Sequence, residues 1–148
     1  MIYAQQGTQT VAGKTALVLI STVNGRSRLI SYKLSNVGQI TLDSQFEVQL
    51  KRFTASGTTT PVTPTSTDPS DPPATLFSAG SNASVEPTYT AGTPIDDVGV
   101  NPRGIYPWSA YDPSAEIILP AVADNGLGFF LNVLGGAVEV VADAKVRQ

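Results

Sequence analysis

The sequence alternates apolar and polar residues over many short runs, which turn-forming residues separate at intervals of about ten residues. In residues 45–51, for example, the apolar side chains fall on one face of an extended chain and the polar ones on the other. This parity breaks at Arg52 and Phe53, where we expect a bulge or the end of the strand. No stretch shows a convincing helical period. The pattern predicts an all-β fold, a jelly-roll-like antiparallel β-sandwich of about eight strands in one domain spanning residues 1–148.

The connection at Asn24 and Gly25 looks like a hairpin turn. An Asn-Gly pair favours the positive φ angles of a type I′ turn, and β-rich runs lie on both sides of it within residues 16–34. Residues 17–20 are apolar at every position. We therefore expect that strand to be covered on both faces, or to keep one face for a partner.

A second hairpin is expected at the end of the sequence. Residues 127–134 and 137–147 are both strand-like, and Gly135 and Gly136 stand between them as a turn. Shorter strands are expected near residues 84–89, 105–110 and 116–119.

The composition limits the chemistry that this chain can perform. Apolar residues make up 41% and charged residues 14%, which is typical of an ordered globular protein. The sequence has neither cysteine nor histidine, which excludes disulfides, thiolate catalysis, Cys-ligated metals and His-based triads. We expect no catalytic residue, no cofactor and no metal, and a protein that is not an enzyme.

Charge is distributed unevenly along the sequence. Residues 1–53 carry six basic and two acidic side chains, a net +4, while the remainder carries three basic and ten acidic ones, a net −7. The two halves could dock electrostatically, between copies or onto a charged partner, or they could interleave in one fold and cancel. Basic residues are too few and too poorly interleaved with aromatics to predict nucleic-acid binding. No run is long enough to span a membrane, and the polar N-terminus predicts cytoplasmic synthesis without a signal peptide.

Two segments are predicted to lie outside the regular strands. Residues 56–75 are rich in Thr, Ser and Pro, and proline lacks the backbone donor that a central strand needs. An extended loop along the surface is favoured over a flexible linker, because long structureless stretches within a domain are uncommon. Residues 1–15 have little to bury and are expected to form an arm that orders against a neighbouring copy, or else a frayed terminus.

Three groups of acidic residues are candidates for a chemical site. Asp96 and Asp97 adjoin, but neighbours on a strand point to opposite faces. Asp124 starts an Asp-Asn-Gly sequence that lacks the regularly spaced ligands of a calcium loop and fits a turn. Glu86 and Glu116 could serve as a glycosidase pair only if the fold brought them together. A structural role is expected for all three groups.

An aromatic group, Tyr106, Trp108 and Tyr111, allows two interpretations. It anchors the core of the sandwich, or it forms an exposed platform on which sugars stack. The second interpretation corresponds to a carbohydrate-binding or host-recognition module on a virion or tail. A non-viral structural subunit, such as a surface-layer or adhesion domain, is a third alternative.

Several segments together resemble a known class of proteins. They are residues 3–11 (YAQQGTQTV), 52–58 (RFTASGT), 68–72 (DPSDP), 86–92 (EPTYTAG) and 116–121 (EIILPA). In these turn-rich segments the chain is similar to the small β-sandwich auxiliary head proteins of tailed bacteriophages, which are also called cement or decoration proteins.

The resemblance implies a non-catalytic role on the exterior of a capsid. Such a protein would bind outside the major capsid protein as a homo-oligomer, a trimer in preference to a dimer, and brace the shell. The candidate contact residues are Tyr3, Gln5 and Gln9 in the arm, Arg52 and Phe53 at the strand break, Pro61, Pro64, Asp68 and Asp71 in the loop, and Arg103 in a turn.

Overall fold

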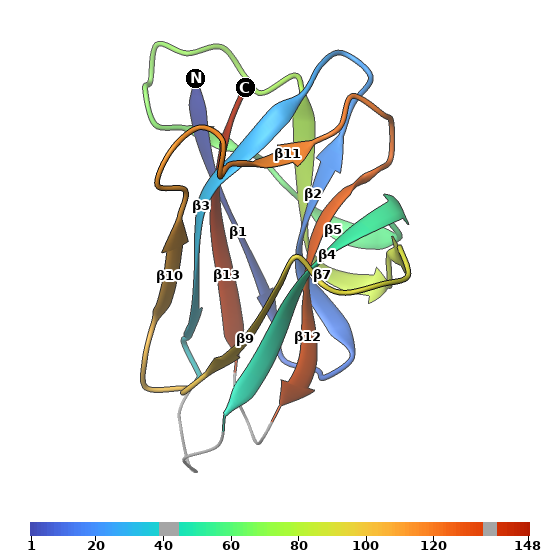
Figure 1. Cartoon of the computed structure of the whole chain (residues 1–148), viewed down its shortest axis with the longest axis vertical. Coiled ribbons are helices and arrows are strands. Elements are labelled where there is room, and N and C mark those ends of the chain that lie inside the picture. The colour runs from blue at the N-terminus through green and yellow to red at the C-terminus, as the bar shows by residue number, and fades with distance from the viewer. Residues whose placement is uncertain (39–44, 135–138) are drawn as a thin grey trace.

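The computed structural model describes residues 1–38, 45–134 and 139–148. Within these ranges the chain is all-β, and two antiparallel sheets pack face to face as a β-sandwich (Figure 1). The all-β sandwich predicted from the sequence is therefore confirmed.

The first sheet has six strands in the order β10-β3-β13-β1-β6, with β11 also pairing with β3. Their bounds are β1 Ile2–Gln9, β3 Ser27–Asn36, β6 Thr65–Ser66, β10 Tyr106–Ser109, β11 Ile117–Leu119 and β13 Val140–Arg147. The second sheet has seven strands in the order β5-β7-β2-β12-β4-β8, with β9 also pairing with β4. Their bounds are β2 Lys14–Ser21, β4 Phe46–Ala55, β5 Thr58–Val62, β7 Phe77–Val85, β8 Thr88–Tyr89, β9 Asp96–Val100 and β12 Gly126–Leu134.

The first predicted hairpin is wrong. β2 belongs to the second sheet and β3 to the first, so the connection through Asn24 and Gly25 crosses from one sheet to the other. Neither residue has the positive φ of a type I′ turn. β2 pairs instead with β7 and β12, and β3 with β10, β11 and β13. The apolar sides of β2 and β3 consequently face each other across the core.

The second predicted hairpin is also wrong. β12 lies in the second sheet between β2 and β4, whereas β13 lies in the first sheet between β3 and β1. The proposed turn at Gly135 and Gly136 lies outside the described residues. The strand positions themselves are right, as are those predicted near residues 105–110 and 116–119. The strand predicted near residues 84–89 is interrupted, because β7 ends at Val85 and β8 holds only Thr88 and Tyr89.

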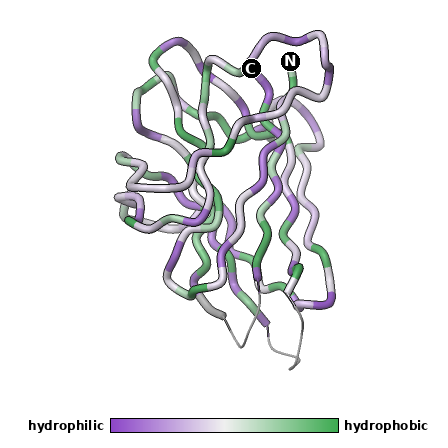
Figure 2. Tube along the Cα trace, turned by 180° about the vertical axis from the view of Figure 1, so that it is seen from behind, coloured by the Kyte–Doolittle hydropathy of each residue, from purple (hydrophilic) through white to green (hydrophobic). Residues whose placement is uncertain are grey.

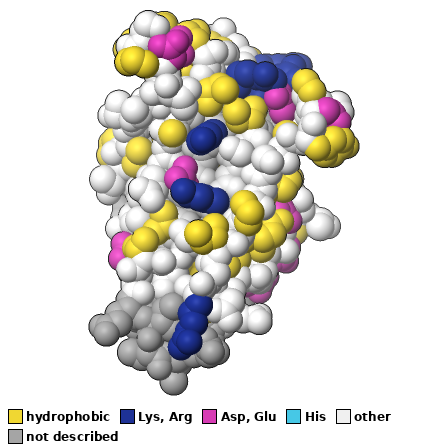
Figure 3. All heavy atoms as spheres, turned by 90° about the vertical axis from the view of Figure 1, so that its left-hand side faces the viewer, with side chains coloured by type: hydrophobic (Ala, Val, Ile, Leu, Met, Phe, Trp, Pro, Cys, Tyr) yellow, Lys and Arg dark blue, Asp and Glu magenta, His cyan; other side chains and the backbone are white. Residues whose placement is uncertain are grey.

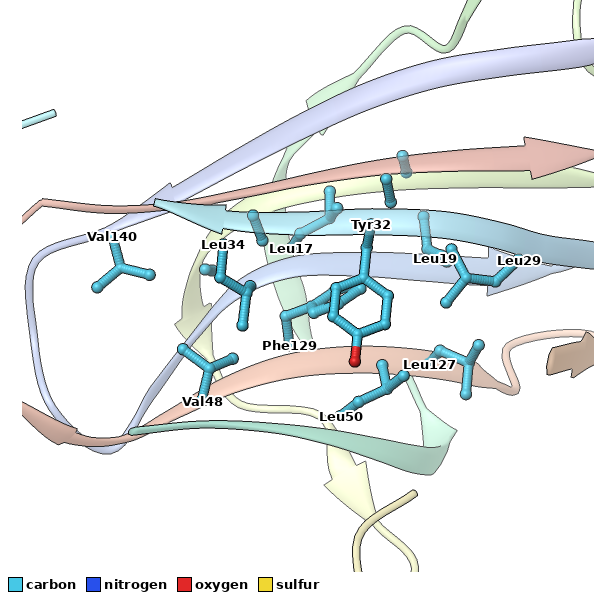
Figure 4. Close-up of a cluster of buried hydrophobic side chains, with 14 of the residues drawn as sticks. Leu17, Leu19, Leu29, Tyr32, Leu34, Val48, Leu50, Leu127, Phe129 and Val140 are labelled. Carbon is cyan, nitrogen blue, oxygen red and sulfur yellow. The ribbon is translucent and has the colours of Figure 1, made fainter. Parts of the chain in front are cut away.

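The core fills the space between the two sheets. Strands β2, β4 and β12 supply side chains from one side, and β3 and β13 from the other, and these point toward one another in Figure 4. Figure 2 shows the alternation of hydropathy along the strands that creates these inward faces. The alternation predicted for residues 45–51 is confirmed, since Phe46, Val48 and Leu50 are at most 2% exposed.

The outer face of the second sheet is partly covered by the segment that follows β7. Glu86 accepts hydrogen bonds from the amide and hydroxyl of Thr15 (3.0 and 2.6 Å), and the Tyr89 hydroxyl lies 2.5 Å from that same hydroxyl. Burial raises the pKa of Tyr89. Val18, at an outward position of β2, is fully buried. Of the two expectations for residues 17–20, cover on both faces is the correct one.

Arg52 and Phe53 do not mark a bulge against β12. Both keep regular register, opposite Leu127 and Gly126, and the irregularity falls one residue later, against β8. Phe53 instead points to the outer face, where it is 2% exposed and meets the Tyr89 ring edge-on at 6.4 Å. Residues 86–89, which lie over the outer face of the second sheet, therefore help to bury Phe53, the residue at which the sequence pattern predicted a strand break.

The predicted N-terminal arm is wrong for residues 2–9. They form β1, which pairs with all of β13 on one side and with β6 on the other. Gly7 allows this position, because a Cβ there would lie 2.2 Å from the carbonyl oxygen of Ala16. β1 is thus packed directly against the second sheet, and its polar inward side chains concealed this from pattern analysis.

The tract at residues 56–75 is partly strand. β5 lies at the edge of the second sheet, against β7, and β6 at the edge of the first, against β1. Pro61 sits in β5, opposite Gly80. The tract therefore avoids central positions, as proline requires. It is not structureless, because backbone pairing fixes two parts of it.

The two charged halves of the sequence interleave. Strands β1 to β4 pair mainly with strands from the second half, and Lys33 lies 3.3 Å from Asp143. Arg28 likewise lies 3.4 Å from Glu116. The split along the chain is therefore largely cancelled in space.

Candidate interaction surface

The outer face of the first sheet carries a group of basic side chains. On β13, the core residues Ala142, Ala144 and Val146 alternate with Asp143, Lys145 and Arg147, which must point outward. The strand register places Asp143 opposite Lys33, and Arg147 opposite Arg28. We call this surface the basic face and define it by Arg28, Lys33, Lys145 and Arg147.

Two carboxylates neutralise part of the basic face. Glu116 pairs with both Arg147 and Arg28. These contacts hold the pKa of Glu116 below its usual range, and the hydrogen bond from Arg147 has the largest effect. Asp143 pairs with Lys33. Lys145 is exposed and forms no ion pair with any described residue. Four cations against two carboxylates leave the face with a net positive charge.

Three neighbouring hollows shape this face. One of about 340 Å³ lies over Ser31, Lys33, Pro107 and Ser109, and it shares Asp143 with a second of about 420 Å³ beside β1 and β6. It also shares Lys145 with a third of about 550 Å³, which reaches Glu116 and Arg147. Figure 3 views the molecule from the side of β10 and β3 and shows basic side chains spaced along its middle. The shared residues make the hollows one broad, shallow surface, suited to a macromolecule.

Four strands at the sheet edges are poorly suited to adding another strand. Pro107 lies in the edge strand β10 and Pro61 in the edge strand β5, while β6 and β8 are two residues each. Ala110 donates its N–H to the carbonyl oxygen of Ile30 on β3. Because successive residues of a strand direct their N–H groups to opposite sides, the backbone nitrogen of residue 107 faces outward, where proline has no hydrogen to donate. These four strands therefore hinder strand pairing with a partner, whereas β9, an edge strand of five residues beside β4, contains no proline.

The arm residues proposed as contacts are buried. Tyr3 is fully buried and its hydroxyl donates to the carbonyl oxygen of Pro72 (2.7 Å) and accepts from the Gln148 amide (2.9 Å). Gln9 is 3% exposed and its amide bonds to the backbone of Thr15. Gln5 is 4% exposed, and its amide has no hydrogen-bond partner among the described residues. These three side chains belong to the interior of the fold.

The other proposed contact residues are scattered. Arg52 is exposed and donates to the carbonyl oxygen of Ile118 (3.0 Å), whereas Phe53 is buried on the outer face of the second sheet. Arg103 lies in a turn, with its N–H bonded to the Asn101 side chain.

The residues proposed in the loop differ among themselves. Pro61 and Asp68 are exposed, and Pro64 and Asp71 are half-buried. Hydrogen bonds from Ser70 lower the pKa of Asp68, and Asp71 accepts a hydrogen bond from Ser66 (3.0 Å). The structure does not bring the ten proposed residues together into one surface.

The three aromatic residues do not form a platform. Tyr106 and Trp108 are half-buried and pack against the core, with the Trp108 ring stacked on Tyr32 at 5.2 Å. Tyr111 is 88% exposed and lies beyond β10. Tyr32 donates a hydrogen bond to Asp96. The pKa of Tyr32 is raised mainly by burial and also by this hydrogen bond. The core interpretation therefore holds for Tyr106 and Trp108.

The acidic candidates have separate structural partners. Glu86 is bound to Thr15 on the second sheet, and Glu116 to arginines on the first. Asp96 accepts from Tyr32, and Asp97 from Gln49 (3.1 Å). Neither pair forms a shared carboxylate site.

Asp124 occupies a turn, with φ of 61°, and accepts hydrogen bonds from Ser56. Among residues 1–38, 45–134 and 139–148, no three acidic side chains cluster as a metal site would require.

Sequence reasoning missed the basic face. The outward parity of Lys33 and Lys145 was visible in the sequence, because each alternates with core residues. The pairing of β3 with β13 was not visible, and only that pairing puts these lysines on one surface.

In the described part of the chain, no helix has the length and apolarity needed to cross a membrane. Comparison with protein-family models, with curated proteins and with solved structures finds no match to this chain.

Proposed function

We propose that this protein is a virion structural protein, a decoration protein that binds the outside of an icosahedral phage head. In this proposal it associates with itself, as a trimer in preference to a dimer, and contacts the major capsid protein. It acts without catalysis or cofactor and stabilises the capsid lattice by noncovalent contacts.

The observation that carries this proposal is the basic face. It is broad, shallow and charged, and its first hollow is lined both by polar residues such as Ser31 and Ser109 and by apolar ones such as Pro107 and Trp108. Small-molecule sites are usually deeper and more enclosed, whereas a protein partner can cover a shallow surface with a mixed lining.

We further infer that the sandwich is a jelly roll. Four antiparallel pairs support this: β1 with β13, β2 with β12, β3 with β10, and β4 with β9. These four pairs are nested one inside the other, as in one long folded hairpin, and successive pairs lie in alternate sheets. Capsid and lectin domains are common uses of this architecture, so the fold is compatible with the proposed role.

In the proposed role, binding to several capsid sites at once would hold the protein on the shell. A capsid offers many identical sites, so an oligomer that touches several of them gains effective concentration at every contact after the first. Individual contacts can then be weak, as expected for a surface built from a few lysines and arginines and many small polar residues.

The experiment is to add the purified protein to phage heads that lack it. We expect it to sediment with the heads and to raise the temperature at which they rupture and release DNA. Heads incubated with a β-sandwich protein of similar size and charge serve as the control. Failure to sediment, or an unchanged rupture temperature, would contradict the proposal.

A further inference from the structure

The face of the sandwich opposite the basic face carries an acidic patch. On β4, the core residues Phe46, Val48 and Leu50 leave Glu47 and Gln49 pointing outward. On β9, the core residues Val98 and Val100 leave Asp97 outward in the same way. We call Glu47 and Asp97 the acidic patch.

No cation neutralises the acidic patch within the described residues. Gln49 donates to Glu47 and to Asp97 (3.3 and 3.1 Å), and Asn132 donates to Glu47 (3.1 Å), so the side chains that donate to these two carboxylates are neutral amides. The next outward residue of β4, Lys51, is held over the rings of Tyr89 and Phe130 at 4.7 and 4.9 Å.

The patch is open to a partner. A hollow of about 430 Å³ lies beside it, lined by both carboxylate residues together with Gln45, Phe46 and Gly99. Gly99 contributes no side chain, and Asp97 is exposed. The basic face has hollows of similar size beside the exposed Lys145. Each face therefore offers charge of one sign that the chain itself does not fully neutralise.

We propose that the basic face of one copy docks on the acidic patch of the next copy. The contact is heterologous, because it joins two different surfaces, and the joined pair retains one free acidic patch and one free basic face. Repetition of such a contact closes into a ring if the rotation between copies allows it. This inference rests on the proposed function and deepens it by naming a second copy of the chain as the partner of the basic face.

Other ways of joining two copies are less favourable. A contact of the basic face with itself would bring like charges together, as would a contact between two acidic patches. Strand pairing at the edges formed by β5 and β10 is hindered by Pro61 and Pro107. The chain as a whole has a net charge of −3, so attraction between copies requires this local complementarity.

Charge reversal tests the contact. Lys145→Glu and Asp97→Lys each place like charges at the interface, and we expect each to weaken self-association at least tenfold. The double variant Lys145→Glu/Asp97→Lys restores opposite charges and should recover most of the lost affinity. Arg26→Glu is the matched control, because Arg26 is exposed in the connection between β2 and β3 and the charge change equals that of Lys145→Glu.

The readout is sedimentation velocity over a range of protein and salt concentrations, with circular dichroism to verify folding. A wild-type protein that stays monomeric at all concentrations would overturn the inference, as would single variants that associate normally. Single variants that dissociate without recovery in the double variant would show that the two faces do not meet, and would overturn it as well. Sedimentation with phage heads is scored separately, so a monomer that still binds heads contradicts this inference and the proposed self-association, and leaves the proposed binding to the capsid standing.

Discussion

Phe129 and Phe130 are adjacent on β12 but point to opposite faces of the second sheet, which gives a direct test of the fold. Phe129 is fully buried in the core, and its ring meets the Tyr32 ring edge-on at 5.2 Å. Phe130 is half-buried on the outer face, near the Tyr89 ring and the Lys51 ammonium. The same substitution, Phe→Ala, therefore removes very different contacts at the two positions.

Phe129→Ala should destabilise the protein by about 3–5 kcal/mol, the range for a buried Phe whose cavity cannot collapse. Its cross-strand neighbours, Leu17 and Leu50, are held in paired strands and cannot fill the space. Phe130→Ala should cost about 1–2 kcal/mol, from partial burial, one aromatic pair and one cation–π contact. For a chain of this size, the first loss corresponds to a fall in Tm of between about 6 and 20 °C.

The assay is urea unfolding of the wild-type protein and both variants, followed by tryptophan fluorescence and far-UV circular dichroism. All samples are compared at one protein concentration, since self-association would otherwise shift apparent stability. Equal losses at the two positions, or a larger loss for Phe130→Ala, would refute the assignment of Phe129 to the core and of Phe130 to the outer face.

Two further predictions concern β1 and the basic face. Gly7→Ala should destabilise the protein by about 1–3 kcal/mol or more, because the new Cβ would meet the backbone of Ala16; unchanged thermal unfolding would instead indicate a free N-terminal arm. Glu116→Gln should lower stability at neutral pH, because the arginine contacts depress the pKa of Glu116 in the folded state. A depressed pKa stabilises the fold above the unfolded-state pKa of about 4.3, and this contribution is lost as pH falls through the folded-state pKa. Denaturant unfolding should therefore distinguish wild type from Glu116→Gln at pH 7 and not in strong acid, and a difference independent of pH would contradict the ion pairs.

The inward faces of several strands could be predicted from the sequence because alternation is a local property. In β4 and β13 every second residue is apolar, and those residues are the buried ones. The same reasoning failed for β1, whose inward positions hold Tyr3, Gln5, Gly7 and Gln9. These residues are buried by close approach of the second sheet and, for Tyr3 and Gln9, by hydrogen bonds to distant or backbone atoms, and no local pattern encodes either cause.

The pairing of strands could not be predicted from the turn residues. A Gly-containing connection between two β-rich runs has the same local sequence whether it joins neighbours in one sheet or crosses between two. In this chain the connections after β2 and β12 cross. Crossing lets the apolar sides of successive strands face each other, which buries more apolar surface than a two-stranded hairpin can.

The sequence by itself determined the all-β class, the approximate strand positions and the absence of thiol and imidazole chemistry, since these depend on composition and on a period of two residues. Only the tertiary structure decided that β1 is a core strand and that residues 86–89 cover the second sheet. It also placed Lys33 and Lys145 on one face and Glu47 and Asp97 on the other. The physical reason is that a charged surface forms from residues on strands far apart in the chain, and long-range antiparallel register brings those strands together.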